Sequence, residues 1–250
     1  MALKFVIAWE AELPGEEHAD LSISGLLSGL HKYGAEAFLI PAAYAEEKTL
    51  AQILKENGLK PEEGLALVAT DASLAQTAGL PIATVAFLHP AFPGQSLLSA
   101  QILVQGFEEV DFYFLERIYD RKHNIPWRVI DTERCYLREM KEDDLDALYE
   151  LYAGEGMTRY MEPLYEDREE EAEYMRAYIA SQYYYYGYGM WVVIERATGK
   201  LIGRAGLDNR NIHGGIELEM GYAVAADHHR QGYATEICLA ILKYAGEFLE

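Results

Sequence analysis

Short apolar runs alternate with amphipathic stretches along the first half of the chain. The runs have the length and composition of buried strands and cover residues 4–9, 37–40, 65–69 and 82–87. The stretches between them carry leucines at helical spacing or end at glycine, which predicts helices over residues 21–34, 49–56 and 72–78. Strands that alternate with helices are typical of a parallel sheet, so this half is predicted to be a layered parallel α/β domain.

The second half has a different pattern. Its apolar runs predict strands over residues 135–138, 191–195, 201–207 and 216–225. Helices are predicted over residues 143–152, 169–186 and 235–248. In the second helix we expect one stripe of Tyr174, Tyr178 and Tyr185, and in the last we expect burial of Ile237, Ile241, Tyr244 and Phe248. The second half is therefore predicted to be a mixed sheet with helices, an α+β domain.

A polar segment separates the two patterns. Residues 121–124 are polar, and Pro126 disfavours a helix at the residue before it. Most of the 19 tyrosines lie beyond this point, several of them in a patch at 183–188. We therefore expect two domains, residues 1–125 and residues 131–250.

Charge narrows the range of partners. The chain of 250 residues carries 21 basic and 41 acidic residues, a net charge of −20. Nucleic acid and an anionic membrane both select clustered cations, so neither is an expected partner. The charge is explained either by solubility or by a cationic substrate such as an amine.

The cellular compartment is predicted from the lack of a membrane-spanning stretch and of a signal peptide. No apolar stretch reaches the roughly 18 residues that span a bilayer, and residues 1–9 do not form a signal peptide. Cys135 and Cys238 show neither zinc nor disulfide spacing, and we expect both to be small buried side chains. A cytoplasmic protein without a bound metal is the expectation.

The segment with the most chemical information joins a strand to the last helix. It contains Glu219-Met220-Gly221-Tyr222 and then Arg230-Gln231-Gly232-Tyr233-Ala234-Thr235-Glu236. The N–H groups at the head of a helix have no helical acceptor, and a glycine allows close approach of an anion. The segment is therefore either an anion-binding loop or an ordinary connection with a turn glycine.

These residues resemble a known family. The motifs "EMGY" at 219–222 and "RQGYATE" at 230–236, with an opening strand at 132–139, look like the GNAT N-acetyltransferases, especially the ribosomal-protein alanine acetyltransferases. The resemblance implies acetyl-CoA as the cosubstrate. It also implies that the cofactor is bound by Tyr222, Ala223, Val224, His229, Arg230, Gln231, Gly232, Tyr233, Ala234 and Thr235. His229 departs from the pattern, because the family has glutamine or arginine at that position.

The resemblance further implies transfer of an acetyl group to an amine, which must lose a proton. Glu217 and Glu219 alternate along their strand and should share one face, whereas Ile216, Leu218 and Met220 take the other. Glu219 matches a position where family members carry a catalytic glutamate, and Glu217 is the second candidate base. Both could instead be solvent-facing carboxylates. A small-molecule amine and a protein N-terminus are both open as acceptors.

The first half has a weaker resemblance. Leu67-Val68-Ala69-Thr70-Asp71 followed by Ala78-Gly79-Leu80-Pro81-Ile82 looks like the last motif of haloacid-dehalogenase-like hydrolases, with Asp71 as the metal-binding acid. The nucleophile motif of that family is replaced by residues 9–13, which contain no aspartate. A degenerate, inactive domain is expected, and a generic α/β layer is the alternative.

Three functions stay open. An acetyltransferase is expected first, a non-enzymatic acyl-CoA-binding or interaction module second, and a phosphatase third. GNAT proteins continue past the last helix with further strands, so we expect the C-terminal part of this domain to be missing. The sheet edge this exposes favours association, and a homo-oligomer is among the expected assemblies.

Overall fold

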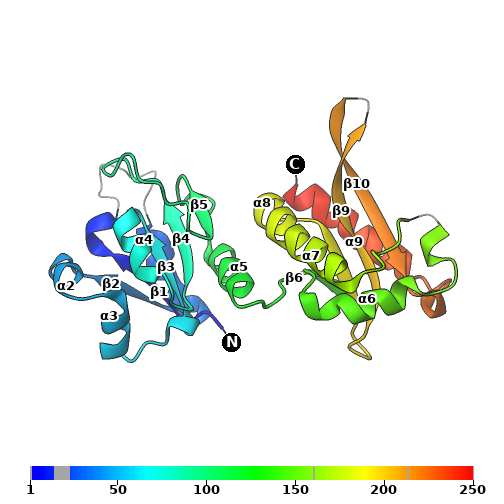
Figure 1. Ribbon diagram of the computed structural model, residues 1–250, viewed down its shortest axis with the longest axis horizontal. Coiled ribbons are helices and arrows are strands. Elements are labelled where there is room, and N and C mark those ends of the chain that lie inside the picture. Colours follow the sequence, from blue (N-terminus) through cyan, green and yellow to red (C-terminus); the bar gives the residue numbers. More distant parts are fainter. Residues whose placement is uncertain (1, 14–22, 160, 213, 250) are drawn as a thin grey trace. The chain divides into compact units, whose positions relative to one another are not determined.

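The computed structural model describes residues 2–13, 23–159, 161–212 and 214–249. The chain divides into two units, residues 1–125 and residues 126–250, each with its own sheet and hydrophobic core (Figure 1). None of the described helices is long and apolar enough to cross a membrane.

The sheet of the first unit is parallel. Its strands lie in the order β2-β1-β3-β4-β5. They are β1 Phe5–Trp9, β2 Glu36–Ile40, β3 Gly64–Val68, β4 Ala83–Phe87 and β5 Ile102–Val104. The helices are α1 Ser24–Gly29, α2 Ala42–Glu47, α3 Leu50–Glu56, α4 Asp71–Thr77 and α5 Phe112–Lys122. Strands β1, β3 and β4 are buried along their whole length, as expected for a sheet covered on both faces.

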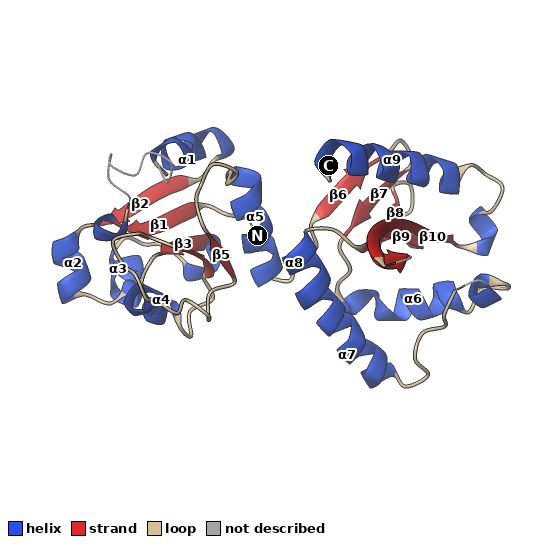
Figure 2. Ribbon diagram, turned by 90° about the horizontal axis from the view of Figure 1, so that it is seen from above, coloured by secondary structure: helices blue, strands red, loops and turns tan. Residues whose placement is uncertain are grey.

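Helices cover both faces of this sheet (Figure 2). Helix α1 packs against one face through Leu26 and Leu27, as does α5 through Leu115 and Ile118, and α3 and α4 pack against the other face. The predicted strands and the helices matching α1, α3 and α4 are confirmed, whereas Leu21 lies outside the described residues. Helices α2 and α5 and strand β5 were not predicted.

The sheet of the second unit is antiparallel, with strands in the order β10-β9-β8-β7-β6. The strands are β6 Arg128–Asp131, β7 Cys135–Arg138, β8 Met190–Glu195, β9 Leu201–Ile212 and β10 Gly215–Val224. The helices are α6 Leu145–Tyr152, α7 Arg168–Tyr178, α8 Tyr184–Tyr186 and α9 Tyr233–Phe248. The predicted order of strand, two helices, three strands, loop and helix is confirmed, with β6 as an additional strand.

Helix α9 covers one face of the second sheet, and α6 and α7 cover the other (Figure 2). Tyr244 of α9 packs edge-on against Trp191 of β8, with ring centroids 5.4 Å apart. On the opposite face Tyr152 and Tyr178 approach Arg204 of β9. The outer side of β10 has no strand partner among the described residues, so its backbone groups form a sheet edge.

The expected tyrosine stripe is wrong. Helix α7 ends at Tyr178 and continues through a π-helical turn, Ile179–Tyr183, before α8. A π turn adds a residue and rotates the side chains that follow it. Tyr183 is consequently buried, and Tyr185 is 82% exposed.

Two smaller expectations also need correction. Phe248 is 67% exposed at the end of α9, because it lies beyond the part of the helix that packs on the sheet through Ile237 and Ile241. Cys135 is fully buried as expected, and burial raises the pKa of its thiol to about 11. Cys238 is only partly buried.

Candidate active site

The loop between β10 and α9 holds two residues in the left-handed backbone region. Arg230 has φ +59° and Gly232, which immediately precedes α9, has φ +85°. The N–H of Glu236 donates the first hydrogen bond of the helix, to Gly232 O at 3.1 Å. The N–H groups of Tyr233, Ala234 and Thr235 come before it and have no helical acceptor, which is the arrangement that binds anions.

A pocket of about 330 Å³ opens at this loop. Its lining residues are Val224, His228, His229, Arg230, Gly232, Tyr233, Ala234 and Thr235. The structure therefore brings together seven of the ten residues expected to bind the cofactor. Tyr222, Ala223 and Gln231 are not in the lining: the first two lie on β10, and the Gln231 side chain donates to Asp227 O at 2.7 Å.

An arginine from the start of the domain holds this loop in place. The Arg134 Nε donates to Glu236 Oε2 at 2.6 Å, and its Nη1 donates to Gln231 O at 2.9 Å. Its guanidinium also lies over the Tyr233 ring, 4.1 Å from the centroid. Sequence reasoning missed Arg134, because its partners are about a hundred residues away and no local pattern connects them.

A carboxylate from β8 holds the loop from its other side. Glu195 accepts hydrogen bonds from the Tyr233 hydroxyl at 2.6 Å and from the Thr198 hydroxyl at 2.7 Å. These hydroxyls, together with nearby His228, lower the pKa of Glu195 below its ordinary value of 4.5. Glu195 thereby joins the β8–β9 turn to the first residue of α9.

The two histidines of the loop have local partners. His228 Nδ1 lies 2.6 Å from Asp227 Oδ1, and His229 Nε2 donates to Val224 O at 2.8 Å. His229 therefore ties the loop to the end of β10. Among the described residues, no group of three or more His, Cys, Asp or Glu side chains is placed to hold a metal ion.

Acid is expected to loosen this site. A carboxyl whose pKa is lowered by folding stabilises the fold above its unfolded pKa, and that stability is lost as the pH falls through the folded pKa. The melting temperature of the second unit should therefore decrease as the pH is lowered below about 4.5. This decrease should be less steep in Glu195→Gln than in the wild type. Calorimetry over this range tests the expectation. The exposed Glu150→Gln is the matched control, and equal slopes for Glu195→Gln and wild type would contradict the prediction.

The two candidate bases lie on one face of β10, as the alternation predicts. Glu219 is paired across the strands with Asp208, and Glu217 with Arg210. The Glu219 Oε2 accepts from Arg210 Nε at 2.5 Å, and this contact raises the pKa of Arg210. Both glutamates are exposed. On the other face Ile216 is 78% exposed, so this end of the strand is not covered by the described residues.

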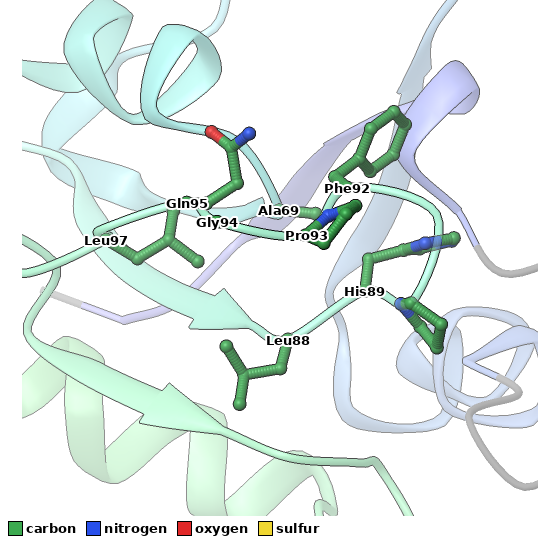
Figure 3. Close-up of a pocket in the computed structure, with 9 residues that line it drawn as sticks. Ala69, Leu88, His89, Phe92, Pro93, Gly94, Gln95 and Leu97 are labelled. Carbon is green, nitrogen blue, oxygen red and sulfur yellow. The ribbon is translucent and has the colours of Figure 1, made fainter.

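The first unit has its own pocket at the carboxyl ends of β3 and β4 (Figure 3). Its volume is about 230 Å³, and the segment after β4 supplies most of the lining, including His89, Phe92 and Pro93. Ligands of parallel α/β sheets commonly bind at this end of the strands.

Asp71 holds the segment that lines this pocket. Its carboxylate accepts from the N–H of Ser96 at 3.0 Å and of Leu97 at 2.8 Å, and these bonds lower its pKa. The Gln95 Oε1 in turn accepts from the Asp71 N–H at 2.7 Å. Asp71 is thus engaged by backbone donors, and the hydrolase-like interpretation of this unit stays a prediction.

Together these features define a class of domain. An open strand edge continues into a loop whose N–H groups form an anion site, which suits an extended ligand with a phosphate group. Residues 134–250 match the profile of a family described as "Acetyltransferase (GNAT) domain". The second unit is therefore similar to GNAT acetyltransferase domains over residues 134–250.

Individual proteins are also similar to part of this chain. The "Uncharacterized N-acetyltransferase YoaA" of Bacillus subtilis is 26% identical over 116 residues, which cover 46% of this chain and 65% of that protein. The chain thus spans just under two thirds of the length of this curated relative. A putative GNAT-family acetyltransferase from Bordetella pertussis is similar in structure, with a TM-score of 0.41 and 19% identity over 48% of this chain and 74% of the other. A putative ribosomal-protein-serine acetyltransferase from Vibrio cholerae has a TM-score of 0.40 and 20% identity over 49% and 68% of the two chains.

Proposed function

We propose that the second unit binds acetyl-CoA and transfers its acetyl group to a primary amine. The observation that carries this proposal is the loop after β10, where Arg230 and Gly232 have left-handed backbone angles and the first residues of α9 line one pocket. The match of residues 134–250 to the GNAT family model supports it, because acetyltransferases of this family use acetyl-CoA.

The residues of the loop fit a pyrophosphate. A Cβ built on Gly232 would meet nothing closer than Arg134 Nη2, at 3.5 Å, so the space beside its backbone is open for a ligand. The N–H groups of Tyr233, Ala234 and Thr235 would hold the phosphate oxygens, and the helix dipole would favour their negative charge.

The open edge of β10 fits an extended arm. Backbone groups of Tyr222, Ala223 and Val224 would pair with the amides of the pantetheine arm, as a further strand would. Acetyl-CoA supplies an acyl group activated as a thioester. In this chain Glu219 is the proposed base that takes the proton of the attacking amine, with Glu217 as the second candidate.

A non-enzymatic acyl-CoA-binding module is the second candidate function. The ion pair of Glu219 with Arg210 favours it, because that carboxylate has a protein partner in the structure. The two functions share the loop and differ in turnover. An enzyme releases CoA thiol from acetyl-CoA only when an acceptor amine is present, whereas a binding module releases none.

The proposal is tested by ligand-induced stabilisation. Acetyl-CoA at a hundredfold its Kd should stabilise the second unit by about 2.7 kcal/mol, which is seen as a rise in melting temperature. Gly232→Ala should lose most of this rise, because φ +85° strains any residue with a Cβ and the loop must change shape to relieve it.

Gly156→Ala is the matched control. Gly156 has φ +77° in the same unit and, like Gly232, no close neighbours at its Cβ position. Both variants should lose about 1 kcal/mol of stability, but Gly156→Ala should keep the full response to acetyl-CoA. The proposal fails if the wild type shows no response, or if Gly232→Ala responds as the wild type does.

A further inference from the structure

Arg204 places a guanidinium inside the second unit, on the face of the sheet that α6 and α7 cover. It stands on β9 between Val192 of β8 and Ala223 of β10. Its Nη1 donates to the Tyr152 hydroxyl at 3.2 Å, and its guanidinium lies 5.8 Å from the centre of the Tyr178 ring. The neighbours of this charge are thus tyrosines from both helices.

No carboxylate pairs with Arg204 among the described residues. Its Nε is enclosed and has no hydrogen-bond partner in the part of the chain that the structure describes. Arg138 of the same unit shows the usual arrangement: both of its Nη atoms donate to the Asp144 carboxylate at 2.6 Å, and both side chains are largely buried. The contrast is notable in a chain with 41 acidic residues.

A guanidinium without a carboxylate partner lowers the stability of the fold when it is buried. A charged group removed from water loses several kcal/mol unless an opposite charge or a full set of hydrogen bonds replaces the water. A tyrosine hydroxyl and a tyrosine ring satisfy only part of this requirement. An anion from outside the chain would satisfy the rest, and a guanidinium is shaped to bind a carboxylate through two parallel hydrogen bonds.

The position of Arg204 indicates which ligand carries that anion. The loop between β10 and α9, which is proposed to bind the phosphates of the cosubstrate, leads into α9 on the opposite face of the sheet. The anion at Arg204 is therefore not one of these phosphates. A chain paired with the edge of β10 would lie two strand spacings from β9, about 10 Å. An amino acid or short peptide would therefore be long enough to place its carboxylate on Arg204 and its amine at the acyl group of acetyl-CoA bound along that edge.

We propose that Arg204, with Tyr152, binds a carboxylate of the acceptor, so that the preferred acceptor is an amine that also carries a carboxylate. This inference rests on the proposed acetyl transfer and adds the chemical class of the acceptor. The Tyr152 hydroxyl accepts from Arg204, so its proton is available to donate to the same carboxylate.

The test compares amines in matched pairs. Alanine, phenylalanine and glutamate are each assayed beside the corresponding α-carboxamide, with wild type, Arg204→Met, Arg204→Lys and Arg176→Met. Arg176 is an exposed arginine of α7 with carboxylate partners and controls for the loss of one positive charge. The KM for acetyl-CoA is measured for every variant.

We expect the wild type to prefer the free carboxylate about 10- to 100-fold in KM for at least one pair. Arg204→Met should bring that ratio close to one, Arg204→Lys should restore part of it, and Arg176→Met should retain it. The KM for acetyl-CoA should stay the same throughout. Turnover by the wild type without such a preference overturns the inference and leaves the proposed function standing.

A second measurement keeps the inference separate from turnover. Binding of N-acetylalanine and of N-acetylalaninamide to the wild type is compared by NMR in the presence of CoA. This comparison needs neither catalysis nor a folded Arg204 variant. Equal binding of the two, or binding of neither, overturns the inference, whereas absent stabilisation by acetyl-CoA overturns the proposed function.

Discussion

Replacing Glu219 by glutamine is expected to lower kcat about 100-fold or more. The attacking amine must lose a proton, and a positioned base contributes about 10²- to 10⁴-fold to such a reaction. Glutamine keeps the size of the side chain and its contact with Arg210 but cannot take up the proton. The measurement is release of CoA thiol from acetyl-CoA with an acceptor amine, together with the KM for acetyl-CoA, which should not change.

Glu217→Gln distinguishes the two candidate bases. Glu217 is exposed on the same face of β10, two residues from Glu219, and its replacement should change kcat little when Glu219 is the base. Loss of folding does not explain an effect at Glu219, because the Glu219–Arg210 pair is exposed and such pairs contribute about 0–1 kcal/mol. Unchanged turnover in Glu219→Gln would remove this residue from the mechanism, and a loss confined to Glu217→Gln would move the role there.

The largest effect on stability is expected at Glu12 of the first unit. Its buried carboxylate accepts from the Ala69 N–H at 2.6 Å and from the hydroxyls of Thr70 at 2.8 Å and Ser73 at 2.9 Å. Glu12→Ala leaves these donors without their acceptor at the point where β3 meets α4. A buried donor without a partner costs about 1–3 kcal/mol, so the unit should lose about 2–4 kcal/mol.

Hydrogen exchange measures this loss within the intact chain. The amides of β3 should exchange faster in Glu12→Ala than in the wild type, while those of β8 serve as an internal reference from the second unit. Glu10→Ala is the matched control, because Glu10 is exposed in the same 3-10 turn, Glu10–Glu12. Equal protection of β3 in the wild type and Glu12→Ala would show that the hydroxyls and the backbone find other acceptors at little cost.

Most elements of the fold could be predicted because their signals are local. Buried parallel strands are continuous apolar runs, and residues 4–9 and 65–69 are of this kind. Helix α5 also carried a local signal that was missed: Asp111 caps its first turn, and Leu115, Ile118 and Tyr119 form a buried stripe. The π turn after Tyr178 carries no such signal, because it depends on how Tyr183 packs in the core.

The candidate site could be predicted only where one segment contains it. The loop at residues 230–236 is continuous in the sequence, and its glycine and helix start are recognisable there. The residues that hold or face the site come from elsewhere. Arg134 and Glu195 each act through partners that only the fold brings close, so a pattern along the chain does not identify them.

The burial of Cys135 makes its thiol slow to react with thiol reagents. With a pKa of about 11, only about one Cys135 thiol in a thousand is ionised at pH 8, and the thiolate is the reactive form. Burial also raises the pKa of the Cys238 thiol. A disulfide dye added to a working reaction would therefore report the CoA that is set free, with little background from Cys135 of the native protein.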